Sequence, residues 1–245
     1  RGFDDNKEIK KDDLYRIYSM TKPIVSVAIM QLYEKGKFHL NNPVEKFIPE
    51  LKNLKIAITK DSLIDAKNKI TIKHLLTHTS GLSYGWSRHP ADSYYRKAGL
   101  FNSKSSDDFI DRVSKLPLRF EPGTKYNYSI STDILGILVE RISGLSLSDY
   151  LNKNIFDPLG MVDTFFEVPR NKAKRFLPNH TYNRSTNQIN TIDSGKYEDS
   201  EKIEGSTMRN YYDVNMYSGG GGLVSTAYDY MIFAECLRNG GEFNG

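Results

Sequence analysis

The sequence predicts a helix-rich α+β fold, and two observations lead to that prediction. Residues 20–35 carry apolar side chains all around a helical projection, which predicts a helix buried on every side. The rest of the chain repeats helical patterns and offers few strand-like alternations. A helix buried on every side is rarely surrounded by other helices alone. A β-sheet contributed by sequence beyond the two ends is one candidate to pack against it.

The first predicted helix has clear limits. Residues 1–13 before it are charged and predict a loop or the end of a hairpin. Pro23 fits the first helical turn, where its missing N–H costs little. Gly36 is well placed to end the helix, because glycine adopts the left-handed conformation at a helix C-terminus easily.

Short helices separated by loops are predicted for the middle of the chain. The segments are a loop with short turns at 41–51, a short helix within 70–82 that begins at Thr71 and closes at Ser80–Gly81, a long loop at 83–106, and a helix over 106–118 that Ser106 caps and Pro117 ends.

Three further helices and one polar segment are predicted for the second half. The segments are a helix over 131–144 capped by Ser131 or Thr132 and ended by Gly144, a helix over 146–161 that stops before Pro158, a polar hairpin or flap at 170–215, and a helix that opens near Ser225 or Thr226 after a glycine-rich turn.

Composition excludes several classes of protein. The net charge of +4, from 34 basic and 30 acidic residues, is too small and too scattered to argue for a nucleic acid or membrane-surface partner. A single cysteine, Cys236, excludes an internal disulfide and a cysteine-built metal site, and we expect it to be an inert core thiol. No apolar run is long enough to predict a membrane span.

Both ends of the sequence are predicted to be cut. The chain begins at Arg1 rather than Met, and it stops in the turn "LRNGGEFNG". A leader segment is therefore left open, and so is the compartment, with periplasm and cytoplasm both possible. The oligomeric state is left open as well.

Ser19 and Lys22 are the first candidate functional residues. Residues three apart lie on one helical face, so the serine hydroxyl and the lysine amine can meet at the entrance of the buried helix. The positive end of the helix and burial both favour a neutral amine, which can accept the serine proton. The free N–H groups of the first turn could stabilise an oxyanion. The Ser-x-x-Lys spacing is unspecific alone, and a capping serine with a solvated lysine is the structural alternative.

Tyr126 and Tyr128, in "EPGTKYNYSIS", precede the helix predicted at 131–144. A tyrosine held beside a cationic lysine can shuttle protons. The structural alternative is a pair of turn aromatics that cover a core.

Other residue patterns have weaker functional interpretations. His74 and His78 have the i, i+4 spacing of a helical metal site, but residue 75 is leucine where a metalloprotease needs glutamate, and helix packing and turn capping are favoured over zinc. The glycines at 219–222 lack the Gly-Lys-Ser/Thr of a phosphate loop and predict a tight turn under the site.

A set of aromatic residues lies in the predicted loop at 83–106. Its members could line a substrate cleft or form a small core of their own, and they are Tyr84, Trp86, Tyr94 and Tyr95.

Five blocks occur in an order that resembles one enzyme family. They are "SMTK", "HLLTHTSGL", "PGTKYNYS" before "ILGILVERISG", "IFDPLGMVDTFF" and "SGGGGLVSTAYDY", and they cover about residues 14 to 241. Together they resemble the serine beta-lactamase-related family, which comprises class C beta-lactamases, penicillin-binding DD-peptidases and esterases of the same fold. The resemblance implies that Ser19 is the nucleophile, Lys22 the base and Tyr128 the tyrosine of the Tyr-Ser-Asn motif.

The same resemblance implies a domain organisation. The expected fold is beta-lactamase/transpeptidase-like, here mostly the helical domain plus the nucleophile helix, with the antiparallel sheet largely missing. Residues 1–40 would belong to an α/β domain, 41–215 to a mainly helical inserted domain with the polar excursion at 170–215, and 216–245 to a return segment. A Lys-Thr-Gly or His-x-Gly motif is expected beyond Gly245, so we expect inefficient turnover by this chain alone.

The sequence as a whole predicts a serine hydrolase that works through an acyl-enzyme without metal or organic cofactor. Ile130 stands where the family has the asparagine that orients an amide substrate, which favours a carboxylic ester as the small-molecule substrate. A beta-lactam or a D-amino-acid peptide is the alternative. A non-catalytic binding or assembly protein is the alternative of another class.

Overall fold

The computed structural model describes residues 8–202 and 210–243. Residues 1–7 of the predicted N-terminal loop, and residues 203–209 of the predicted polar segment, lie outside the described part. Among the described helices, none is both long and apolar enough to cross a membrane.

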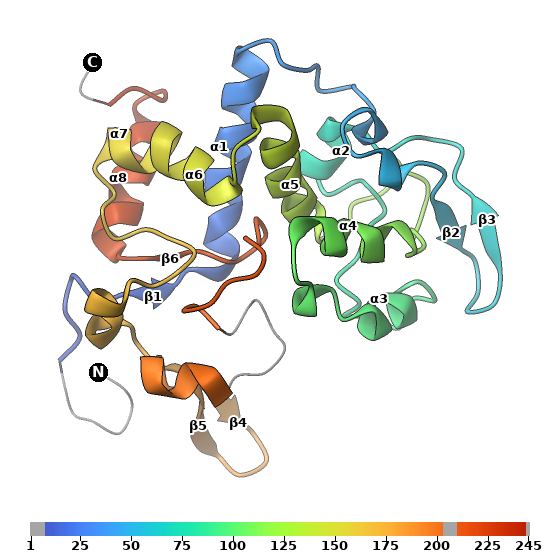
Figure 1. Cartoon of the computed structure of the whole chain (residues 1–245). Coiled ribbons are helices and arrows are strands. Elements are labelled where there is room, and N and C mark those ends of the chain that lie inside the picture. The colour runs from blue at the N-terminus through green and yellow to red at the C-terminus, as the bar shows by residue number, and fades with distance from the viewer. Residues whose placement is uncertain (1–7, 203–209, 244–245) are drawn as a thin grey trace.

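Helices dominate the described fold, and most strands are short (Figure 1). The helices are α1 (Thr21–Glu34), α2 (Ile72–Leu76), α3 (Asp92–Ala98), α4 (Ser106–Ser114), α5 (Ser131–Ser143), α6 (Leu147–Leu151), α7 (Asp157–Leu159) and α8 (Ala227–Arg238). The strands are β1 (Tyr15–Arg16), β2 (Lys55–Ala57), β3 (Leu63–Asp65), β4 (Asn179–Asn183), β5 (Gln188–Asp193) and β6 (Val224–Ser225). This arrangement is the helix-rich α+β architecture that the sequence predicts.

Each described sheet is a two-stranded antiparallel pair. The β1–β6 pair joins distant parts of the chain, with Tyr15 opposite Ser225 and Arg16 opposite Val224. The β2–β3 and β4–β5 pairs are local hairpins, and β4–β5 confirms the hairpin predicted within 170–215. The β1–β6 pair brings the first 40 residues and the segment from 216 onward together, which supports the predicted domain division as a proposal.

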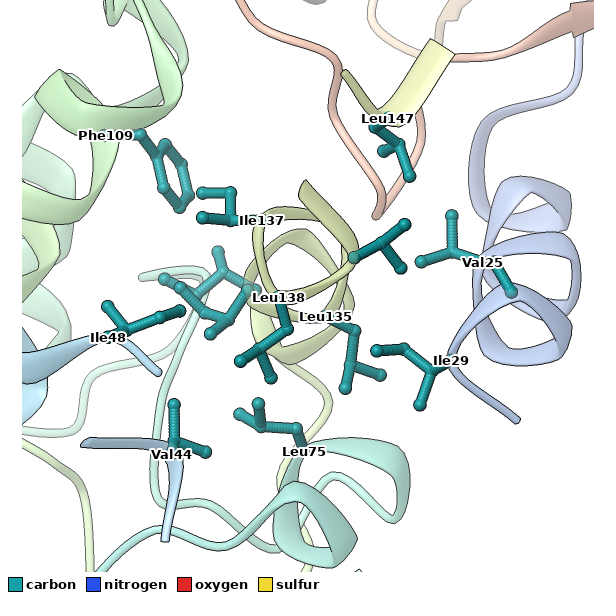
Figure 2. Close-up of a cluster of buried hydrophobic side chains, with 14 of the residues drawn as sticks. Val25, Ile29, Val44, Ile48, Leu75, Phe109, Leu135, Ile137, Leu138 and Leu147 are labelled. Atoms are coloured by element: carbon teal, nitrogen blue, oxygen red, sulfur yellow. The ribbon is translucent and has the colours of Figure 1, made fainter. Parts of the chain in front are cut away.

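The main core surrounds α5, which lies beside α1 in the middle of the molecule (Figure 1). Every residue of α5 from Ser131 to Val139 is buried. Figure 2 shows α5 between Val25 and Ile29 of α1 on one side and Ile48 and Phe109 on the other. Because α5 is covered on all sides, its apolar side chains link the α1–α8 half of the molecule to the half that carries α2–α4.

Helix α1 is less buried than the sequence predicts. Its buried face contains Ile24, Val25, Ala28, Ile29 and Leu32. Tyr33 is 38% exposed, and Val27 and Met30 are only half-buried. The prediction of burial on every side was therefore wrong for α1; it is α5, whose sequence contains polar residues, that is enclosed.

Cys236 is half-buried rather than a core thiol. It lies on α8 and lines a cavity together with Val27 of α1 and Leu159 of α7.

Two loop and helix boundaries differ from the predictions. The segment 83–106 is not one long loop, because it contains α3, which ends at Gly99 in the left-handed conformation. Helix α2 ends at Leu76, well before the predicted turn at Ser80–Gly81. The helix begins directly after Thr71, close to the expected start, and this residue caps α2, since its hydroxyl accepts the N–H of His74 at 3.2 Å.

Three predicted helix boundaries also need correction. Ser105, not Ser106, caps α4, because its Oγ accepts the N–H of Asp108 at 3.1 Å. Helix α5 has no side-chain cap, and its predicted caps are buried inside its first turn. Pro158 lies within α7 instead of ending the preceding helix, since proline is compatible with a first helical turn.

Other predicted ends are confirmed. Gly36 and Gly144 take left-handed conformations after α1 and α5. Thr226 caps α8 by accepting the N–H of Asp229 at 3.1 Å.

Truncation of Leu138 tests the role of α5 in stability. Leu138 is fully buried in this helix. We expect Leu138→Ala to lower the free energy of unfolding by about 2–5 kcal/mol, because the lost transfer energy adds to the cost of a cavity. Urea denaturation measures this change. Leu145→Ala, at a position 37% exposed, is the matched control and should change stability by less than about 1 kcal/mol. Equal effects of the two substitutions would contradict the central place of α5.

Candidate active site

Ser19, Lys22 and Tyr128 meet at one point on the surface. The Ser19 Oγ lies 2.6 Å from the Tyr128 hydroxyl, and the Lys22 Nζ donates to the same Oγ at 3.2 Å. The Lys22 Nζ also lies 4.6 Å from the centre of the Tyr128 ring, within range of a cation–π contact. The structure therefore brings together the three residues that the sequence singles out, although Tyr128 lies far from the other two along the chain.

A sharp turn between β1 and α1 presents the serine. Tyr18 has a φ of +43°, a conformation that side chains other than glycine rarely adopt. Residues Tyr18–Met20 form a single 3-10 turn that leads into α1, and Ser19 is exposed on it. Backbone strain at such a turn is typical of functional sites, where the surrounding structure must hold it in place.

Two backbone donors at this turn are less available than the sequence predicts. The Met20 N–H donates to the carbonyl of Ile17 at 2.9 Å. The Thr21 N–H donates back into the same turn. Neither group is free to stabilise an oxyanion, because both already have a partner within the turn.

The glycine-rich turn positions Lys22 through a backbone carbonyl. The Gly220 carbonyl accepts a hydrogen bond from Lys22 Nζ at 2.5 Å. Glycines 219 and 220 approach α5 closely: a Cβ on Gly219 would lie 2.5 Å from the Thr132 carbonyl oxygen. The tight turn under the site that the sequence predicts is present, and its carbonyl positions the amine beside Ser19.

Asp133, in the first turn of α5, supports this turn and was missed by the sequence analysis. Its Oδ1 accepts the Ser218 hydroxyl at 2.6 Å and the Gly220 N–H at 3.0 Å. Burial raises the pKa of this carboxyl, while the two hydrogen bonds and the Lys22 charge act in the opposite direction. An acidic residue at the start of a largely apolar predicted helix was the available signal.

His78 positions the other side of the site. It has a φ of +53° and lies outside α2, so His74 and His78 do not share a helix as the metal interpretation required. Its ring packs on Tyr128 with 4.9 Å between ring centres, and its Nδ1 accepts the Ser129 N–H at 3.3 Å. Within the described residues, no group of three or more potential side-chain ligands could hold a metal ion.

His78 is uncharged at neutral pH. Burial, together with the positive charge of Lys22, lowers the pKa of His78 to about 4. The neutral ring can accept the Ser129 N–H and lie near a lysine without charge repulsion.

The aromatic set of residues 83–106 divides between site and core. Tyr84 stacks on Trp86 with 4.5 Å between ring centres, and Tyr84 also packs on Tyr128. Tyr95 is buried, while Tyr94 donates its hydroxyl to the Lys60 carbonyl at 2.6 Å. Only Tyr84 and Trp86 therefore belong to the site.

Comparison with known proteins identifies the family of this chain. The family model described as Beta-lactamase matches residues 1–245. The chain therefore belongs to the beta-lactamase family, as the ordered sequence blocks indicate.

The chain is similar to several individual proteins and solved structures. Protein Rv1367c of Mycobacterium tuberculosis is 31% identical over 100% of this chain and 59% of that protein. Esterase EstB of Burkholderia gladioli is 36% identical over 65% of this chain and 40% of that protein. The solved structure of EstCE1, described as a hydrolase with promiscuous acyltransferase activity, has a TM-score of 0.79 and 25% identity, and the match covers 97% of this chain and 62% of that one. The chain spans 59% of the length of Rv1367c.

Substitution of Gly220 tests the support of the lysine. A Cβ at this position would collide with Asp133 Oδ2 and lie 2.8 Å from the Tyr84 hydroxyl. We expect Gly220→Ala to displace the carbonyl that holds Lys22 and to slow reaction of Ser19 with a fluorophosphonate probe about 10²-fold, the cost of a misplacement of roughly 1 Å. Intact mass spectrometry over time gives the rate, and circular dichroism checks that the variant is folded. A folded variant labelled at the unmodified rate would contradict this role.

Acid should destabilise the protein through His78. The pKa of His78 is about 4 in the folded chain and about 6.5 when unfolded, so the unfolded chain binds the extra proton between these values. The stability contributed by the neutral ring is present above about pH 6.5 and is lost as the pH falls towards 4.

The variant His78→Asn removes this titration and keeps a side chain that tolerates the left-handed backbone. As the pH falls from 7.5 to 5, we expect the unfolding free energy of the variant to decrease less than that of the unmodified chain. Urea denaturation at both pH values measures the difference. An NMR titration in which the His78 ring titrates near its unperturbed pKa of about 6.5 would show this explanation to be wrong.

Proposed function

We propose that this chain carries the catalytic centre of a serine hydrolase that forms an acyl-enzyme on Ser19. The observation that carries the proposal is the meeting of three groups: Ser19 Oγ lies 2.6 Å from the Tyr128 hydroxyl and 3.2 Å from Lys22 Nζ. A plain capping serine does not account for this arrangement, because Ser19 makes no side-chain cap to α1. Membership of the beta-lactamase family supports the same interpretation.

Acylation is the first half of the proposed reaction. Ser19 Oγ attacks the substrate carbonyl carbon, and the neutral Lys22 amine takes the serine proton. The bond from the carbonyl carbon to the leaving oxygen then breaks, and Tyr128 supplies a proton to that oxygen. Lys22, now protonated, returns its proton to the Tyr128 oxygen, so the charges of both residues are restored. The Gly220 carbonyl keeps the amine aimed at Ser19 throughout.

Deacylation is the second half. Water attacks the acyl carbonyl carbon and Lys22 accepts its proton. The bond from that carbon to Ser19 Oγ then breaks, Lys22 returns the proton to Oγ, and the carboxylic acid is released. An alcohol in place of water would give acyl transfer, for which the acyl-enzyme needs no new group. The description of EstCE1 as a hydrolase with acyltransferase activity supports this second outcome.

Carboxylic esters are the favoured substrates. Ile130, at the start of α5, is fully buried. Because an isoleucine side chain has no amide group, it cannot orient the amide of a peptide or lactam as an asparagine could. The similarity to an esterase, EstB, supports the ester class. A beta-lactam or a D-amino-acid peptide remains the alternative substrate class, and a non-catalytic binding protein is the alternative of another class.

A fluorophosphonate probe tests the proposal directly. We expect one adduct per chain, on Ser19, because the probe reports an activated serine. Ser19→Ala should abolish it, and Lys22→Met and Tyr128→Phe should slow it by about 10²–10⁴-fold, the range for removal of a general acid–base group. Peptide mass spectrometry locates the adduct.

A second serine provides a matched control. Ser106 lies on α4, away from the site, and the Ser106→Ala variant should be labelled on Ser19 at the unmodified rate. Labelling that survives Ser19→Ala, or no labelling of the folded chain, would exclude the proposed centre. Rapid labelling by penicillin with slow reaction of simple esters would favour the alternative substrate class.

A further inference from the structure

The only tryptophan of the chain is solvent-exposed beside the candidate site. Trp86 is 77% exposed, although one face of its ring stacks on Tyr84 at 4.5 Å with an angle of only 12° between the rings. An exposed indole that is already stacked on a second ring offers a flat apolar face, and burial of such a face against another ring is favourable. The indole therefore presents an apolar face next to the proposed nucleophile.

The loop that carries Trp86 is held firmly. Arg96 donates from one nitrogen to the Gly85 carbonyl at 2.7 Å and to the Ser87 carbonyl at 2.9 Å, on either side of the tryptophan. The buried carboxylate of Asp92 accepts both the N–H and the hydroxyl of Ser87, at 2.8 and 2.7 Å. An aromatic ring on a loop fixed in this way loses little entropy when it binds a partner, which is the property of a preformed binding surface.

The position of the indole relates it to one end of a substrate. The Trp86 ring centre lies 6.2 Å from that of Tyr128, whose hydroxyl contacts Ser19 Oγ. In the proposed reaction Tyr128 protonates the leaving alkoxy oxygen, so the group attached to that oxygen lies on the Tyr128 side of the carbonyl. It can extend along the Tyr128 ring onto Trp86.

We propose that Tyr84 and Trp86 form a stacking platform that selects esters with a flat, neutral aromatic group on the alcohol side. This inference rests on the proposed function for the direction of the substrate. The Lys22 Nζ lies 5.6 Å from the centre of the Tyr84 ring, and it becomes positively charged when it takes the serine proton, which disfavours a cationic group there. A flat neutral ring can continue the stack that Tyr84 and Trp86 begin.

Two isomeric esters test the platform by binding alone. Benzyl acetate carries its phenyl ring on the alcohol side and methyl phenylacetate carries it on the acyl side, with the same atoms in both. In the Ser19→Ala variant, which cannot form an acyl-enzyme, we expect benzyl acetate to change the tryptophan fluorescence saturably. Its Kd should be about tenfold lower than that of methyl phenylacetate. Trp86 is the sole source of this signal.

Further variants of the same Ser19→Ala chain test the residue itself, with saturation-transfer NMR of the phenyl protons as the readout. Adding Trp86→Ala should remove the tenfold preference, and adding Trp86→Phe should keep most of it. Adding Tyr228→Ala, which removes a tyrosine 68% exposed on α8, is the matched control and should leave the preference unchanged.

Each contrary result has a distinct meaning. Unchanged fluorescence with benzyl acetate, or a preference that survives Trp86→Ala, would overturn the platform. Equal Kd values for the two isomers would overturn its assignment to the alcohol side. Failure of the proposed function is seen separately, as absence of probe labelling at Ser19 in the unmodified chain.

Discussion

The hydrogen bonds of one buried carboxylate join the core of this protein to its candidate site. Asp133 lies in the first turn of the enclosed helix α5 and binds Ser218 and the Gly220 N–H. The Gly220 carbonyl in turn holds Lys22, the proposed base. The first turn of a helix favours a negative charge, and the buried hydrogen bonds offset part of the cost of removing the carboxyl from water. The position of the amine thus depends on the packing of α5.

The site is assembled where distant segments meet. Ser19 and Lys22 come from the start of α1, Tyr128 from the segment before α5, and Gly220 from the turn before β6. Packing of α1 against α5 and pairing of β1 with β6 hold these segments in register. Their mutual distances are therefore properties of the whole core, and a local peptide containing the Ser-x-x-Lys sequence would not reproduce them.

Local signals in the sequence predicted much of the fold. Gly36, Gly144 and Thr226 act on their own helix ends through backbone conformation or a nearby hydrogen bond, so their effect is visible without tertiary structure. Burial was harder to predict, because it depends on neighbouring segments. The apolar helix α1 is partly exposed, whereas in α5 even the acidic residue Asp133 is buried. Helix α3 was missed because its sequence, DSYYRKA, has no apolar period.

The candidate site was predicted in the same uneven way. Ser19 and Lys22 are one helical turn apart, and the ordered family blocks pointed to Tyr128. Asp133 and His78 were missed as supporting residues, because each acts through a contact with a residue distant in sequence. Asp133 has no spacing that marks it, and the i, i+4 spacing of His78 with His74 suggested a shared helix, although α2 ends before His78.

The contact of two glycines sets a boundary for altering this protein. The Cα of Gly219 lies 3.4 Å from where a Cβ would stand on Gly136, so helix and turn touch backbone to backbone. Mutational libraries built to change selectivity should leave this pair intact, since a Cβ on Gly219 would lie 2.5 Å from the Thr132 carbonyl oxygen of α5 and a Cβ on Gly136 would lie 2.8 Å from the Leu147 side chain. Diversity is better placed on Tyr126, whose side chain is 68% exposed near His78 and can vary without disturbing that junction.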